Sequence, residues 1–90
     1  GLPAVFELLQ NYPNPFNAST NIEFTLPTPE NVSVRVYSIT GEQVKELVNG
    51  HWAAGKHEVV WDASHQASGV YLIIFKAGSY HQVRKAVLMK

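Results

Sequence analysis

Cysteine is absent from this chain of 90 residues, and its absence removes several kinds of chemistry at once. Disulfide bonds, thiolate catalysis and zinc sites built on cysteine thiolates all need the missing side chain. Because a cysteine-free chain is compatible with either redox compartment, the absence does not locate the protein. The stability of the fold must therefore come from a hydrophobic core.

The chain also lacks an excess of charge of either sign. Seven lysine and arginine residues balance seven aspartate and glutamate residues, so there is no net positive field to attract nucleic acid or anionic lipid. Long apolar runs are missing too: the longest, Val70 to Phe75, is far short of a membrane span. We expect neither a nucleic-acid partner nor a membrane span.

What is present is the composition of one folded domain. Hydrophobic residues make up 46% of the chain and charged residues 16%, whereas a disordered segment combines low hydrophobicity with high net charge. A chain of this length encloses one core and not two, so we expect residues 1–90 to form a single domain. The opening Gly1-Leu2-Pro3-Ala4 has no initiator methionine and no signal-peptide pattern, which indicates a piece of a longer chain.

Apolar and polar residues alternate along most of the chain, with the period of two that is typical of strands burying one face. The pattern predicts strands over residues 5–10, 22–26, 32–36, 43–48, 57–61, 70–75 and 80–90. The segment 43–48 fits a strand or a single helical turn, and we assign it to a strand. Strands repeating at roughly 8 to 12 residues predict an all-β fold, namely an immunoglobulin-like, fibronectin-III-like sandwich of about seven strands.

Two local expectations refine this fold. Asn49-Gly50 predicts a hairpin turn, because both residues tolerate a positive φ. The last strand, with Val83, Val87 and Met89 on one side and Ala86 and Leu88 on the other, is expected to be bulged near Lys85.

The stretch "NYPNPFN" at residues 11–17 is the densest turn signal in the chain. Its prolines fix φ and push the preceding residues toward extended conformations, while its asparagine side chains can bond to nearby backbone. We expect a structural corner at the start of the sandwich, with Phe16 packed inward. The residues of this turn motif are Asn11, Pro13, Asn14, Pro15, Phe16 and Asn17.

Candidate catalytic and metal-binding groups are scattered. The histidines at 51, 57, 65 and 81 lack the spacing of a metal site. Asp62, His65 and Ser68 offer the groups of a catalytic triad but share one short loop, with no nucleophile elbow. We therefore predict no catalytic residue, no metal and no cofactor, and interpret the domain as something other than an enzyme.

A glycan-binding platform is the main alternative that the residues themselves suggest. Trp52 is expected in a loop, and exposed aromatic rings such as Trp52 and Tyr12 can stack on sugar faces. A loop tryptophan more often closes the end of a sandwich core, and Trp61 is expected to lie in the core. Exposure of Trp52 separates the two interpretations.

Five stretches of the chain resemble one family: "NYPNPFNASTNIEFTLP", "VSVRVYSITGEQVKELVNG", "AAGKHEVVWD", "ASGVYLIIFKAG" and "RKAVLMK". Together they are similar to the C-terminal sorting domain of proteins exported by the bacterial type IX secretion system, and to the related immunoglobulin-like domain of the flagellar hook-capping protein. The resemblance runs from about Leu9 to Lys90. The chain departs from the family pattern at Ala18, where proline is usual, and at Ala63, where glycine is common.

The resemblance implies a non-catalytic domain at the C-terminal end of a larger secreted or surface-bound protein. Its partners would be the outer-membrane secretion machinery and a sortase-like peptidase that removes the domain, and a catalytic domain of the same chain could also contact it. The sorting signal would lie in the last strand, at Lys85, Val87, Leu88 and Lys90. A terminal strand can be read by edge pairing or by displacement from its sheet. The alternatives are a carbohydrate-binding module and a structural spacer of a secreted enzyme.

Overall fold

The computed structural model describes residues 1–90 and contains seven β-strands. The strands are β1 (Glu7–Leu8), β2 (Ser19–Leu26), β3 (Glu30–Ser38), β4 (Gln43–Trp52), β5 (Gly55–Asp62), β6 (Gly69–Ala77) and β7 (Tyr80–Leu88). No helix long and apolar enough to cross a membrane is present. The expectation of an all-β chain is confirmed, and segment 43–48 belongs to a strand.

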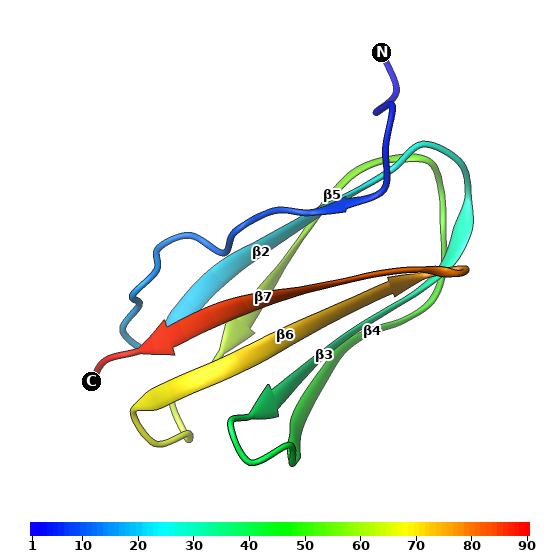
Figure 1. Ribbon diagram of the computed structural model, residues 1–90. Helices are drawn as coiled ribbons and strands as arrows, with labels where there is room; N and C mark the ends of the chain where they lie inside the picture. Colours follow the sequence, from blue (N-terminus) through cyan, green and yellow to red (C-terminus); the bar gives the residue numbers. More distant parts are fainter.

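Two antiparallel sheets face each other, as Figure 1 shows. One has three strands in the order β1-β2-β5, and the other has four in the order β4-β3-β6-β7. Strand β4 pairs with β3 rather than with β5, so the chain changes sheet at the corner Ala53-Ala54 between them. This is the immunoglobulin-like sandwich that the strand spacing predicts.

The core lies between the sheets and is supplied by the inward half of each alternating strand. Ile22, Phe24 and Leu26 of β2 face Ile73 and Phe75 of β6, and all five side chains are buried. Trp61 of β5 is also buried, with its ring centroid 5.3 Å from that of Tyr71. The period of two in the sequence is thus the period at which side chains enter the core.

The prediction of a hairpin turn at Asn49-Gly50 is wrong. Both residues lie inside β4, where Asn49 pairs with Ser33 and Gly50 pairs with Val32. Pairing with β3 along its whole length keeps this segment extended, and the chain turns only after Trp52. Tertiary pairing therefore overrides the local turn preference.

The prediction of a bulge near Lys85 is also wrong. The register between β6 and β7 runs without a shift from Gly69–Leu88 to Ala77–Tyr80. Register shifts occur instead between β3 and β4, at Val34/Arg35 and Val36/Tyr37. Lys85 keeps the alternation because it is an outward residue of a regular strand.

Candidate functional site: the last strand and its free edge

Strand β7 lies at the end of the four-stranded sheet and pairs only with β6. Its inward residues Ala86 and Leu88 are buried in the core, and Leu88 is 1% exposed. Its outward residues include Val83, Lys85 and Val87, which alternate with the buried ones. The strand therefore presents one sealed face and one open face.

The four residues expected to carry a sorting signal divide between these faces. Lys85 and Val87 lie on the outward side, and Lys90 follows the strand in an exposed position. Leu88 points into the core, so its side chain cannot touch a partner while β7 stays in its sheet. The structure thus brings three of the four to the surface at the end of the chain.

Lys90 is held against the loop between β5 and β6. Its backbone N–H donates to the hydroxyl of Ser68 at 3.0 Å, and its Nζ donates to the carbonyl oxygen of Ser64 at 2.7 Å. These contacts fix the position of Lys90, two residues beyond the strand, although its N–H and its ammonium group remain exposed.

The free edge of β7 is covered by residues 8–16, which begin in β1 and lead toward β2 (Figure 1). We call these residues the strap. The N–H of Phe16 donates to the carbonyl of Val87 at 2.9 Å, and the N–H of Met89 donates to the carbonyl of Phe16 at 2.9 Å. These two bonds make a parallel bridge between Phe16 and Leu88, so the strap adds a short piece of strand to the end of the sheet.

Asparagine and glutamine side chains extend this cover along the strand. Asn14 Oδ1 accepts from the N–H of Val87 at 2.9 Å, and Asn14 Nδ2 donates to the carbonyl of Lys85 at 3.3 Å. Gln10 Nε2 donates to the same carbonyl at 2.9 Å. Primary amides carry both a donor and an acceptor, so they can replace the backbone of a neighbouring strand.

Farther along the edge, side chains of β7 reach back to β1. Gln82 Oε1 accepts from the N–H of Leu8 at 2.9 Å, and Arg84 Nε donates to the carbonyl of Leu8 at 2.9 Å. The edges of the two sheets are thus closed against each other. An unpaired strand edge is a template for pairing with other chains, and here that template is already occupied.

The strap itself is braced by Asn11, which is 2% exposed. Asn11 Nδ2 donates to Thr20 Oγ1 at 3.0 Å and to the carbonyl of Pro13 at 3.2 Å. The Thr20 hydroxyl donates to the same carbonyl at 2.8 Å. Phe16, which is 2% exposed, inserts its ring beside Trp61 with the centroids 5.4 Å apart. The turn motif therefore packs into the core at one end and covers β7 at the other.

Asp62, His65 and Ser68 are not arranged as a catalytic triad. Asp62 Oδ1 accepts from the N–H of Ser64 at 3.0 Å, and this hydrogen bond lowers the pKa of Asp62. The Ser68 hydroxyl accepts from Lys90, as described above. His65 is exposed in the same loop and makes no bond to either. These are loop-shaping contacts.

The histidines are dispersed over the sandwich. His51 bonds to Asn31 Oδ1 at 3.1 Å, and His57 bonds to the carbonyl of Ala53 at 2.7 Å. The structure contains no group of three or more His, Asp or Glu side chains arranged to hold a metal ion.

Trp52 and Tyr12 do not form a common aromatic surface. Trp52 is half-buried at the end of β4, where its ring lies 5.6 Å from Phe24 and 4.9 Å from His57, between the sheets. Tyr12 is 77% exposed and bridges to Asn21, an outward residue of β2. The two rings therefore lie on different layers of the molecule.

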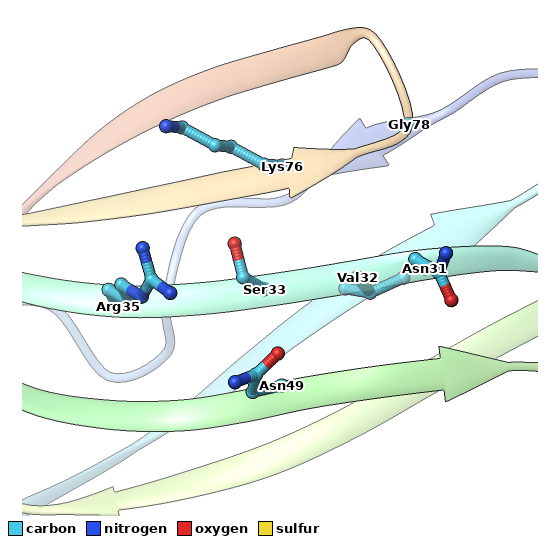
Figure 2. Close-up of a pocket in the computed structure, with 7 residues that line it drawn as sticks. All are labelled: Asn31, Val32, Ser33, Arg35, Asn49, Lys76 and Gly78. Carbon is cyan, nitrogen blue, oxygen red and sulfur yellow. The ribbon is translucent and has the colours of Figure 1, made fainter.

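A shallow depression of about 230 Å³ lies on the outer face of the four-stranded sheet. Figure 2 shows Lys76 of β6, Ser33 of β3 and Asn49 of β4 beside it, on three adjacent strands. Its other lining residues are Asn31, Val32, Arg35 and Gly78. Arg35 is engaged with Glu46, since its Nε lies 3.0 Å from Glu46 Oε2. The depression is rich in donors and open to solvent.

Sequence reasoning missed two features of this site. The first could not have been found, because the strap joins residues 71 to 76 positions apart in the chain, which no local pattern reports. The second, the clustering of basic residues near the C-terminus, is visible in the sequence: residues 68–90 contain Lys76, Arg84, Lys85 and Lys90 and none of the seven acidic residues. The balanced net charge of the whole chain conceals this separation.

Comparison with known families gives the context for this site. Residues 10–89 match the family described as the secretion system C-terminal sorting domain. A search of the curated proteins finds no significant match. The match begins within the strap and includes all of β7, so residues 10–16 of the strap and the whole of the last strand lie inside it. The chain belongs to the C-terminal sorting domain family of the type IX secretion system, a non-catalytic family that directs proteins to the cell surface or the medium through interaction with the secretion machinery.

Proposed function

We propose that the secretion machinery contacts this domain at the outward side of β7 and at Lys90, two residues beyond the strand. The observation that carries this proposal is the placement of Lys85, Val87 and Lys90 together on the surface, on a strand whose other faces are occupied. Leu88 contributes from the core, by keeping β7 in its sheet. The domain acts as the C-terminal module of a larger secreted protein.

Edge pairing with a strand of the machinery is disfavoured in the folded domain. The carbonyl of Lys85 and both the N–H and the carbonyl of Val87 point away from β6 and are bonded to the strap. A partner strand would have to remove Gln10, Asn14 and Phe16 from these groups before it could pair. Recognition through outward side chains needs no such rearrangement.

A sortase-like peptidase and a catalytic domain of the same chain are further proposed partners. The family role supports a peptidase that acts after export and removes the domain from its cargo. Its cut would lie N-terminal to the sandwich, because residues 7–88 are bound into the two sheets. The exposed segment Gly1 to Val5 precedes the first strand and is open to such an enzyme.

An export assay tests the proposal. A reporter is fused to the N-terminus of residues 1–90 in a host with type IX machinery, and export of the native domain is compared with that of the double variant Lys85→Ala, Lys90→Ala. The matched control is Lys45→Ala, Lys56→Ala, which removes two exposed lysines from β4 and β5. We expect the first pair to retain the fusion in the periplasm and the second to be exported. Normal export of both pairs would contradict the proposal.

Point variants are preferable to removal of residues 86–90 in this assay. Deleting that segment also removes two buried side chains and the hydrogen bonds of Val87. A loss of export would then report unfolding as well as loss of the signal. Leu88→Ala serves as the folding comparison, since it perturbs the core and leaves every outward side chain in place.

A further inference from the structure

Of the surfaces of β7, one remains open in the folded domain. The inward face is buried in the core, and the free edge is covered by the strap. The outward face has no covering element. It continues across β6 onto β3, because the register pairs Val83 with Ile74 and Ile74 with Arg35.

We infer that the secretion machinery docks on this whole outer face of the four-stranded sheet, through a protein surface with an apolar centre and carboxylates around it. This inference rests on the proposed function and extends it from the last strand to residues of β3 and β6. The partner is identified by its complementarity to an apolar centre and a basic surround.

The apolar centre is formed by outward residues of three neighbouring strands. We call these residues the outer patch: Tyr37, Val70, Leu72, Ile74, Val83 and Val87. Val83 is 47% exposed, and the others are partly exposed. Surface residues of this kind are ordinary when single, but a contiguous group indicates an interaction site.

Lysine side chains lie beside the outer patch on β6 and β7, whereas the carboxylates near it belong to β3, β4 and the turn that joins them. Lys76 and His81 are cross-strand neighbours at one end, and Lys85 lies opposite Leu72 within the patch. Strands β6 and β7 contain no acidic residue. Of the nearby carboxylates, Glu46 is already paired with Arg35, and Glu30 lies beside Gly78, where its Oε1 accepts from the N–H of Asn31 at 2.9 Å. A partner that carries carboxylates would be attracted and oriented here.

The outer face of the other sheet shows the opposite character. Its outward acidic residues are Glu7, Glu23, Glu58 and Asp62, accompanied by Lys56, which pairs with Glu23 at 3.1 Å. Val60 is its exposed aliphatic residue on β5, at 58%. The two faces therefore differ in both charge and apolar content, and an acidic partner distinguishes them.

The depression on this face is a binding site for one carboxylate of the partner. Lys76 Nζ and the Ser33 hydroxyl carry donors beside it, as Figure 2 shows. Asn49 Nδ2 already donates one N–H to Glu46 Oε1 at 3.4 Å and carries a second. Arg35 lines the depression and is the cross-strand partner of Ile74, so the depression adjoins the outer patch directly. A charged donor with neutral donors beside it is a favourable setting for an anionic oxygen.

A protein surface fits this face better than a lipid surface does. Peripheral membrane binding favours protruding aromatic anchors, with tryptophan prominent among them. Both tryptophans here turn into the sandwich, Trp61 fully and Trp52 partly. The outer patch instead consists mostly of branched aliphatic side chains on a regular sheet, which suit a flat, packed contact.

Paired substitutions on the two outer faces test the inference in the same export assay. Val83→Glu and Lys76→Glu place negative charge on the proposed docking face. Val60→Glu and Lys56→Glu are the matched controls on the other face, at residues of comparable exposure. We expect export to fall at least tenfold for the first two and to stay unchanged for the controls. Thermal unfolding of the purified domains must show that all four variants remain folded; Val83→Ser and Val60→Ser replace any that does not.

The remaining outcomes each overturn the inference in a distinct way. Normal export of Val83→Glu and Lys76→Glu, with export still lost in Lys85→Ala, Lys90→Ala, would leave the proposed signal standing and remove the extended face. Normal export of all of them would remove both. Equal losses on both faces would show a general effect of added negative charge. Sedimentation of the purified domain with phosphatidylglycerol vesicles, abolished by Val83→Glu, would replace the protein partner with a lipid surface.

Discussion

The two long edges of the sandwich are protected by different means. At one edge, the strap covers β7 with backbone and amide hydrogen bonds from Gln10, Asn14 and Phe16. At the other, β4 and β5 have no covering segment. Exposed charged residues and two register shifts between β3 and β4 protect it instead, which are general devices against strand pairing.

This difference shows that the fold protects the β7 edge with specific contacts and the β4/β5 edge with general ones. Charged side chains can be exchanged for other charged side chains, because their effect depends on hydration and repulsion rather than on a partner atom. The strap depends on particular donors and acceptors at particular places. We therefore expect the strap edge to be sensitive to single substitutions and the β4/β5 edge to be tolerant, and the following predictions test this contrast in decreasing order of effect.

Phe16→Ala should have the largest effect, because it removes the buried anchor of the strap. The ring is 2% exposed and packs beside Trp61, and loss of a buried phenylalanine costs about 3–5 kcal/mol. Equilibrium unfolding in urea measures the change. Tyr12→Ala, in the same strap but 77% exposed, is the control and should change stability little. A loss below about 1 kcal/mol for Phe16→Ala would show that the strap is not anchored through this ring.

Asn14→Ala should weaken the edge without disturbing the core. It removes the acceptor of the Val87 N–H and a donor to the carbonyl of Lys85, which we expect to cost about 1 kcal/mol. The specific readout is hydrogen exchange of the Val87 amide, which should become faster. Asn17→Ala, three residues away and exposed, should leave this rate unchanged. Unchanged exchange in Asn14→Ala would mean that the side chain does not protect the edge.

Much of this fold could be predicted from local pattern alone. Alternation predicts β2, β3 and β5 and the residues that they bury, because the period of two reports directly which side of a strand faces the core. Segment 70–75 is apolar on both faces, so its pattern predicts a central strand but not the side that is buried. The corner role of "NYPNPFN" also follows from local chemistry, since proline and asparagine act on their immediate neighbours.

The features that could not be predicted depend on which strands become neighbours. Asn49-Gly50 carries a strong turn signal, yet pairing with Ser33 and Val32 keeps it extended. Asn14 has the same chemistry as Asn17 in the sequence, and only the fold places one of them against Val87. The opposite charges of the two outer faces likewise arise only when the register assigns each residue a side.

Ala18→Gly should slightly stabilise the turn between the strap and β2. Ala18 has φ of 74°, a left-handed conformation that costs an L-residue roughly 1–2 kcal/mol and that glycine adopts freely. The greater flexibility of glycine in the unfolded chain offsets part of this, so we expect a net gain of about 0.5–1 kcal/mol. Ala53→Gly, at the exposed corner before β5 and without a positive φ, should not stabilise. A proline at position 18 could not adopt this φ.

Arg35→Gln should have the smallest effect, because it acts at the tolerant edge. The Arg35–Glu46 pair joins β3 to β4 at 3.0 Å, but its side chains are 34% and 38% exposed. Exposed pairs are hydrated and screened by salt, so they add little to stability. The urea midpoint should stay within error of the native value at both low and high salt. A loss as large as that of Asn14→Ala would mean that the β4/β5 edge also relies on specific partners, and the contrast between the two edges would no longer hold.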